Sequence, residues 1–332
     1  MLGNFFLAVA ATIGEHENVP MLLSSLTNRA ALLHVHWLKA AFIFLLVGYG
    51  TKMGLAPLHT WLPDAHSESP SVISALLSGA LLNCAFLAIL RAQQVCVAAG
   101  QGPFGQKLLV VLGLFSMLVA AAFIVGQADF KRMLAYSSVE NMGILALAVG
   151  LGGSGGFGAM LHAVNHSLTK GMLFLIAGNI LALYRTKSTR EVRGVVRSMP
   201  VSGILWVAGF LAITGSPPFG PFLSELVILK AALDRGQVIV AALYLLTLSA
   251  VFVGMATVVL RMAQGDPAGL PAEYVAAVAG DGGGAHHFFL GELPLAVLPP
   301  MALGAAVLML GVYIPPPLQR LLEQAAKAVG AG

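Results

Sequence analysis

Charged side chains are scarce in this sequence. Asp, Glu, Lys and Arg make up only 10% of its 332 residues, whereas a typical soluble domain has about 25%. So few ions cannot cover the surface of a globular protein. Hydrophobic residues account for 58% of the chain, and the mean hydropathy is +0.87. The composition therefore predicts an integral membrane protein and not the two soluble domains that the length alone would suggest.

Cysteine is also rare, and basic residues do not cluster. The two cysteines, Cys84 and Cys96, lie in or beside apolar stretches and form no CxxC pair, so they cannot build an iron–sulfur, zinc or haem site. We therefore expect no metal and no cofactor in this chain, and any redox chemistry to take place in a partner. The net charge is +4, but no more than two Lys or Arg residues are adjacent, which argues against a nucleic-acid partner.

Long apolar runs divide the chain. A helix needs about 20 apolar residues to cross the hydrocarbon core of a bilayer. The sequence has eight such runs and a shorter one at its start, which predicts an all-α polytopic membrane protein with about eight or nine transmembrane helices. The runs are 1–14 (the short one), 40–58, 72–90, 107–126, 133–150, 157–183, 200–233, 237–260 and 293–314.

One loop carries an excess of positive charge. The basic residues of the 184–199 loop are Arg185, Lys187, Arg190, Arg193 and Arg197. Loops rich in Lys and Arg stay in the cytoplasm. We therefore predict a multi-pass protein of the cell inner (plasma) membrane, with the lipid bilayer around it and this loop on the cytoplasmic side.

Several ionisable residues fall inside the predicted spans, where each costs about 2.5–3.5 kcal/mol on insertion scales. They are Lys52, Glu140, His162, His166, Lys170, Glu225 and Lys230. Lys230 lies within about a turn of Asp234, so its ammonium group can reach the interface. The other positions are too deep for that. Such residues usually mark a pathway for protons or ions, and a structural ion pair is the alternative for each of them.

Three of these residues share one helix face. His162, His166 and Lys170 are spaced i, i+4, i+8, which stacks them over about 12 Å. Neutral imidazole both donates and accepts a hydrogen bond, so such a face can pass protons along through water that Asn165 and Ser167 help to order. The alternative is that the histidines are ordinary core residues. We favour the proton relay because three titratable groups stand in file.

Two predicted spans are interrupted beside an ionisable residue. Lys52 lies in LLVGYGTKMGLAP, and Glu225 ends the stretch AITGSPPFGPFLSE. The residues that interrupt the two helices include Gly50, Pro57, Pro217 and Pro218. Proline frees backbone carbonyl groups in mid-membrane, where only protein or a wet cavity can satisfy them. A pair of interrupted segments is typical of inverted-repeat transporters, whose sites lie at the repeat interface.

These motifs resemble those of the proton-translocating antiporter-like membrane subunits. The similar stretches are GTKMGLAPLHTWLPDAHSESPSVISALLSGALLN (50–83), DFKRMLAYSSVENMG (129–143), LHAVNHSLTKGMLF (161–174) and GSPPFGPFLSELVIL (215–229). That family is shared by respiratory complex I, the multi-subunit cation/proton antiporters and the energy-converting membrane-bound hydrogenases. The sequences of these stretches are most similar to those of hydrogenase-4 component F.

The resemblance implies a role for each ionisable position. Lys52 corresponds to the lysine of the family's broken seventh helix, and Glu225 to the ionisable position of the broken twelfth. The row that starts at His162 corresponds to the charged face of the eleventh helix, and Glu140 falls on the tenth. Asn83 stands where complex I members often have Lys or His on the eighth helix, and an asparagine can hold water but cannot carry a proton.

The resemblance also implies a domain plan. Residues 1–92 would be the remainder of the first repeat (helices 6–8 of the family), and 93–260 the second repeat (helices 9–13). A polar loop (261–292) and then the final helix with an interfacial tail (293–332) would follow. About five helices of the fourteen-helix family core would precede residue 1, so the first repeat is expected to be truncated. A separate chain could supply those helices.

Together these inferences predict a proton-translocating subunit in the membrane arm of a redox-driven complex. The complex would be of the hydrogenase-4/formate hydrogenlyase or the NADH:quinone oxidoreductase type. Its partners would be other membrane-arm subunits and a hydrophilic redox arm, and this chain would hold no catalytic residues. Two alternatives stay open: a subunit of a multi-subunit Na⁺/H⁺ antiporter without redox partners, and a structural remnant of the channel that anchors its neighbours.

Overall fold

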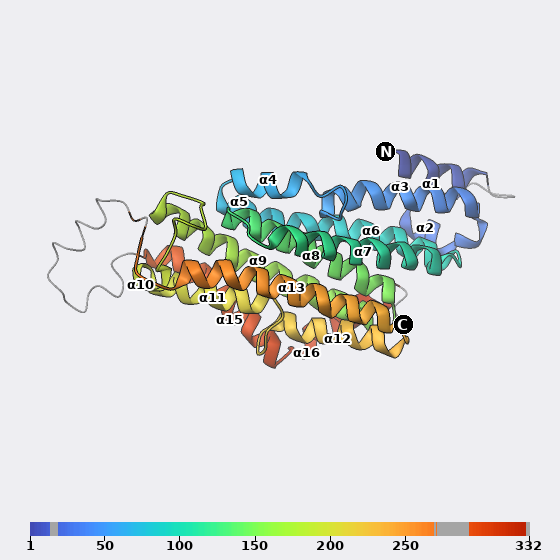
Figure 1. Cartoon of the computed structure of the whole chain (residues 1–332). Coiled ribbons are helices and arrows are strands. Elements are labelled where there is room, and N and C mark those ends of the chain that lie inside the picture. Colours follow the sequence, from blue (N-terminus) through green and yellow to red (C-terminus); the bar gives the residue numbers. More distant parts are fainter. Residues whose placement is uncertain (14–18, 269, 271–291, 330–332) are drawn as a thin grey trace.

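The chain folds into a bundle of helices (Figure 1). In the computed structural model, residues 1–13, 19–268, 270 and 292–329 are described, and all of their regular secondary structure is helical. The elements are α1 (Leu2–Thr12), α2 (Leu23–Asn28), η1 (Ala30–Leu32), α3 (Val35–Met53), α4 (Trp61–Glu68), α5 (Ser71–Leu76), η2 (Leu77–Leu81), α6 (Leu82–Ala98), α7 (Gly102–Ile124), α8 (Phe130–Leu151), α9 (Ser154–Tyr184), α10 (Val195–Ser198), α11 (Pro200–Ile213), α12 (Gly220–Asp234), α13 (Val238–Ala263), α15 (Pro294–Val312) and α16 (Pro316–Ala328).

Six helices of the described part are long and apolar enough to cross a membrane. They are the continuous segment Ser71–Ala98, which joins α5, η2 and α6, and the helices α7, α8, α9, α13 and α15. This confirms the all-α membrane class. The predicted runs at 40–58 and 200–233 correspond to α3 and to the pair α11 and α12, which are not among the six. The total of eight or nine spans stays a prediction.

The long helices run side by side, and most of the turns that connect them lie at the two ends of the bundle (Figure 1). At one end, the turn before α8 is hydrogen-bonded to the 184–199 loop, with Phe130 N 3.2 Å from Lys187 O and Thr189 N 2.9 Å from Ala128 O. We call this the basic end because of the charge of that loop. The opposite end holds the turns 99–101, 152–153 and 235–237.

Helix α8 lies at the centre of the bundle. Every residue of its most apolar 18-residue window is buried. Small residues let α7 approach it backbone to backbone, since a methyl group on Gly113 would lie 2.7 Å from the carbonyl oxygen of Gly143, and a methyl on Gly143 would lie 2.7 Å from that of Gly113. Close packing through small residues is typical of helices in membranes. An ionisable residue in the middle of α8 is therefore surrounded by protein.

Both expected interruptions are present. Helix α3 ends at Met53, where Gly54 turns the chain with a φ of +87°, and helix resumes at Trp61. Helix α11 ends at Ile213, and α12 begins at Gly220. The chain therefore breaks within the bundle at the two places where glycine and proline predict it.

A carboxylate fixes the start of α15 to α11. Glu292 is 6% exposed, and its two carboxylate oxygens accept hydrogen bonds from Val201 N (2.8 Å), Ser202 N (2.9 Å) and Ser202 Oγ (2.5 Å). The first N–H groups of a helix have no partner within it, and a negative charge there is favourable. Glu292 thus caps α11 at the basic end.

The domain boundaries and the repeat relation stay predictions. The polar loop 261–292 falls largely outside the described residues, which resume at Glu292. Helix α16, in the predicted interfacial tail, buries Leu322 and Ala326 and packs against α9. The inverted relation of 1–92 to 93–260 is untested.

Candidate functional site

Glu140 is held at mid-helix in α8. Asp129 caps the start of α8, because its Oδ1 accepts hydrogen bonds from Lys131 N (2.7 Å) and Arg132 N (3.2 Å). Glu140 follows eleven positions later in sequence, which places it about 16 Å along the helix. It is 2% exposed. The sequence thus positions a carboxyl group deep inside the bundle.

The predicted row on α9 is fully enclosed. His162, His166 and Lys170 are all 0% exposed. Lys170 Nζ donates hydrogen bonds to the carbonyl oxygen of Leu134 (2.7 Å) and to Ser137 Oγ. Both of these acceptors lie on α8, so the row faces the central helix.

The two histidines of the row differ in their partners. His162 is hydrogen-bonded on both sides, with Nδ1 3.0 Å from Ser224 Oγ and Nε2 3.1 Å from Asn141 Oδ1. Neither ring nitrogen of His166 has a partner among the described residues. A buried polar group without a partner is costly unless a water satisfies it. His166 is therefore the member of the row whose hydrogen-bonding groups are left unsatisfied by the described residues.

Glu225 enters the cluster from the interrupted helix. It lies in the second turn of α12, is 6% exposed, and its Oε1 has no partner among the described residues. The carboxylate rests directly against Gly215, which has a φ of +65°. A side chain at position 215 would overlap it. The break between α11 and α12 thus gives the Glu225 carboxylate its space.

The structure brings five of the predicted residues together. Glu140 interacts electrostatically with Glu225 and Lys170, and His166 with Lys170 and His162. These groups come from α8, α9 and α12. Carboxylates, imidazoles and an ammonium group that are buried near one another can exchange protons, because each group accepts or donates a proton through a hydrogen bond or a bridging water.

Lys52 is not part of this cluster. Its side chain is exposed on the flank of α3, and its ammonium group lies 5.5 Å from the centroid of the Trp61 ring. Gly50 lies in the last turn of α3, where its carbonyl oxygen accepts a hydrogen bond from Leu55 N (2.8 Å). Pro57 follows in the connection to α4. The first interruption therefore places its lysine apart from the α9 row.

The other supporting residues fall on both sides of α9. Asn83 donates to Ser167 Oγ (2.6 Å) and is half-buried, so it contacts α9 without joining the row. Pro217 and Pro218 lie in the connection from α11 to α12, and a methyl group on Gly311 of α15 would overlap the Pro218 carbonyl oxygen. The second connection is thus packed tightly against α15.

Sequence reasoning did not identify the hydrogen-bond partners of the row as functional residues. Ser137 and Asn141 on α8 and Ser224 on α12 hold the ends of the row. Their signal was present, because small polar residues flank both glutamates in AYSSVENMG and PFLSELVIL. In the described part of the chain, no group of three or more His, Cys, Asp or Glu residues could hold a metal ion.

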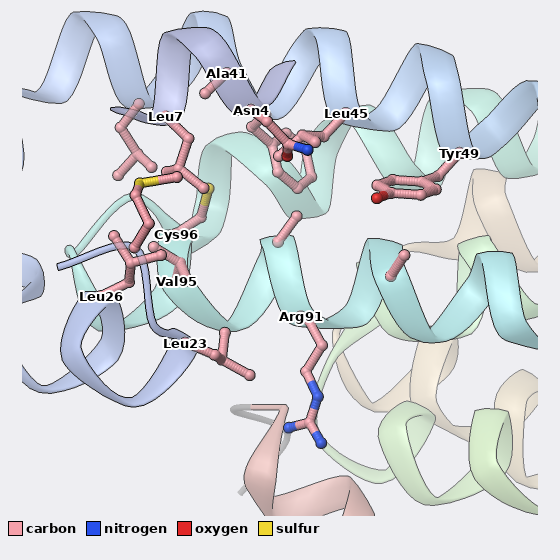
Figure 2. A pocket seen from close by; sticks show the side chains of 15 residues that line it. Asn4, Leu7, Leu23, Leu26, Ala41, Leu45, Tyr49, Arg91, Val95 and Cys96 are labelled. Carbon is pink, nitrogen blue, oxygen red and sulfur yellow. The ribbon is translucent and has the colours of Figure 1, made fainter. Parts of the chain in front are cut away.

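A cavity of about 380 Å³ lies elsewhere, between α1, α2, α3 and α6 (Figure 2). Its lining is mostly apolar and includes Leu7, Leu26 and Leu45. Figure 2 shows Arg91 of α6 extending away from these side chains. None of the five clustered residues lines this cavity, so it is separate from the site.

Comparison with known proteins identifies the family of this chain. Residues 1–252 match the family model described as NADH:quinone oxidoreductase/Mrp antiporter, TM. The hydrogenase-4 component F homolog of Methylacidiphilum infernorum (isolate V4) is 41% identical over 269 residues, which are 80% of this chain and 56% of that protein. NAD(P)H-quinone oxidoreductase chain 4 of Prochlorococcus marinus (strain MIT 9312) is 37% identical over 188 residues, 56% of this chain and 35% of that protein.

A solved structure extends the likeness to the fold. A chain in the structure of respiratory complex I from Thermus thermophilus with bound NADH superposes with a TM-score of 0.74 and 27% identity, covering 99% of this chain and 65% of that chain. The chain thus spans little more than half the length of the component F homolog. The resemblance inferred from the motifs is confirmed, and so is the membrane class: the chain belongs to the NADH:quinone oxidoreductase/Mrp antiporter transmembrane family.

Proposed function

We propose that this chain is a proton-translocating subunit in the membrane arm of a redox-driven complex. One observation carries the proposal: five titratable residues are buried near one another on α8, α9 and α12, and none of them forms a salt bridge with another described residue. They are Glu140, His162, His166, Lys170 and Glu225. Buried charges kept for stability are normally paired. Unpaired groups that lie within electrostatic reach of each other are suited to exchanging protons.

The proposed path follows the contacts. Glu225 lies next to Ser224, whose hydroxyl is hydrogen-bonded to His162. Water at the unpartnered nitrogens of His166 would link His162 to Lys170, and Glu140 lies within electrostatic reach of both Glu225 and Lys170. A change of charge at one group shifts the proton affinity of the next. Lys52 belongs to the path by its motif alone.

The relatives support the redox-driven type of assembly. A hydrogenase-4 component and an NAD(P)H-quinone oxidoreductase chain are similar to this chain over more than half of its length. We therefore propose other membrane-arm subunits and a hydrophilic redox arm as partners, with electron transfer and any cofactor in that arm. The positive charge of the 184–199 loop supports a position of the basic end at the cytoplasmic face of the cell inner membrane.

Replacement of Glu225 tests the proposal. The assembled complex carrying Glu225→Gln is placed in sealed vesicles, and proton uptake and electron transfer are followed together. A positioned proton-transfer group contributes about 100-fold or more, so proton movement per electron should fall to background while electron transfer to soluble acceptors continues. Glu323→Gln makes the same change on the exposed side of α16 and should behave as the parent. Proton movement that is unchanged by Glu225→Gln would refute the proposal.

The family description also favours a second candidate. It names the Mrp antiporter beside the quinone oxidoreductase, and the same five residues could exchange Na⁺ for H⁺ without a redox partner. Vesicles that contain the chain with its natural partners and no reductant separate the two. A pH gradient that forms on addition of sodium ions favours the antiporter, and a gradient that needs an electron donor favours the redox-driven complex.

A further inference from the structure

His66 is a buried imidazole at the end of a short helix. It lies in the last turn of α4, is 0% exposed, and neither of its ring nitrogens has a partner among the described residues. Its ring stacks on Phe174 of α9, with centroids 4.7 Å apart and planes 16° from parallel. Leaving the N–H of a buried imidazole unpaired costs about 1–3 kcal/mol. Packing on a phenyl ring does not require that group, because an apolar side chain could fill the same space.

The position of His66 continues the row on α9. Phe174 is four residues beyond Lys170, so it lies on the same helix face, about 6 Å further towards the basic end. His66 covers this next position. The positive charges of Lys170 and Lys131 act on His66 and disfavour its imidazolium form, so loss of the Lys170 proton favours proton uptake by His66; His166 in turn interacts electrostatically with His66. His66 therefore adds one more titratable group to the row at the same spacing, although it belongs to α4 and not to α9.

Beyond His66 the chain reaches polar surface. Ser67 Oγ donates to Asp129 Oδ2 (2.5 Å), and the Ser67 carbonyl oxygen accepts from Lys131 Nζ and Lys187 Nζ, both at 3.2 Å. Lys187 Nζ also pairs with Glu68 Oε1 at 2.9 Å. We call these five residues the basic-end cluster.

The outer part of the basic-end cluster is open to solvent, whereas Ser67 and Lys131 are buried. The side chain of Glu68 is 79% exposed and that of Lys187 is 32% exposed. The hydrogen bond and charge of Lys187 hold the pKa of Glu68 below its usual range, so Glu68 stays a carboxylate. A proton released from His66 would meet water and fixed charges within one residue of α4.

We propose that His66 carries protons between Lys170 and the basic end of the molecule. This rests on the proposed function. In the step, the Lys170 ammonium gives one proton through a bridging water to a free ring nitrogen of His66, leaving an amine and an imidazolium. The imidazolium then releases the proton from its other nitrogen to water at the basic-end cluster, which restores neutral His66. This exchange requires two ring nitrogens that are available for hydrogen bonds, and both nitrogens of His66 lack a partner among the described residues.

The alternative is that His66 only packs against Phe174. Two substitutions separate the roles. His66→Phe keeps an aromatic ring on Phe174 and removes the proton carrier, whereas His66→Asn keeps a polar group that can hold water and removes both the ring and the titration. A packing role predicts that the phenylalanine variant works. A proton-carrying role predicts that both variants fail.

The test uses the assembled complex in sealed vesicles, with protons moved per electron as the readout. Both His66 variants should lose at least about tenfold in this ratio, with the amount of assembled complex unchanged for His66→Phe. The matched control is His59→Phe, at a histidine that is 6% exposed and contacts Tyr136 through a ring edge. It should keep the parental ratio.

The outcomes also separate this inference from the function on which it rests. A parental ratio in His66→Phe overturns the role of His66. If Glu225→Gln abolishes proton movement in the same preparation, the proposed function stands although His66 is not the carrier. If Glu225→Gln has no effect either, the proposed function itself is wrong. Should the phenylalanine variant fail to assemble, a parental ratio in His66→Asn overturns the role of His66, and a lost ratio at the parental amount of assembled His66→Asn complex supports it.

Discussion

Replacing Gly143 with alanine should force α7 and α8 apart. The two helices touch through their backbones, and the new methyl group would lie 2.7 Å from the carbonyl oxygen of Gly113. Ordinary contact begins at about 3.4 Å, so the helices must open by about 0.7 Å at this point. The neighbouring atom belongs to backbone, and no side-chain rotation can relieve the contact. Glu140 lies one turn away on α8 and would move with the helix.

The cost can be set against a matched substitution. Inserting a methyl group into a packed interior costs about 1–3 kcal/mol, and a gap of 0.5–1 Å forfeits about a quarter to a half of each affected contact. Gly48→Ala makes the same chemical change on α3, where a methyl group would meet nothing within 4 Å. There the change should stabilise the helix by about 0.4–1 kcal/mol, because alanine loses less conformational entropy than glycine.

The assay is thermal unfolding of the purified chain or complex in one detergent, with the two variants beside the parent. Gly143→Ala should lower the midpoint and Gly48→Ala should leave it unchanged or raise it slightly. Shifts of opposite sign support the backbone contact between α7 and α8. A Gly143→Ala protein as stable as the parent would show that the helices are not held this closely, and the burial of Glu140 would then need another explanation.

Two further predictions use matched controls. Gly215→Ala should reduce proton movement at least about tenfold, because its methyl group would overlap the Glu225 carboxylate. The control is Gly236→Ala, at a similar φ of +67°, where a methyl group would meet nothing within 4 Å. It imposes the same backbone strain and should reduce stability only. Glu292→Gln should cost about 1–2 kcal/mol of unfolding free energy, since a neutral amide caps α11 less well, whereas Glu323→Gln on the exposed face of α16 should cost nothing measurable.

The sequence alone predicted the parts of the site that depend on local rules. The row from His162 to Lys170 follows from the helix period, and both interruptions follow from glycine and proline next to an ionisable residue. The depth of Glu140 follows from its place within an apolar run. Each of these signals lies within a few neighbouring residues, so no knowledge of packing is needed to read it.

The remaining parts depend on contacts between distant segments. His66 belongs to a short helix after the first interruption, and only the fold lays its ring on Phe174. Ser224 reaches His162 because α12 packs against α9. For Lys52, too, the local motif does not predict the surroundings: the motif groups Lys52 with the site, whereas the structure places it on the exposed flank of α3. Spacing along one helix predicts a face, and packing decides what that face meets.

The direction of the row gives the proposed path its shape. Helix α9 is 31 residues long, or about 46 Å, and the row together with Phe174 occupies its middle third or so. Protons that move along it would therefore travel along the helix axis, towards the basic end. The two glutamates lie beside the row on α8 and α12, so exchange with them runs sideways. On this axial path the ring nitrogens of His166 and His66 have no partner among the described residues, so the proposed transfer needs a bridging water at both.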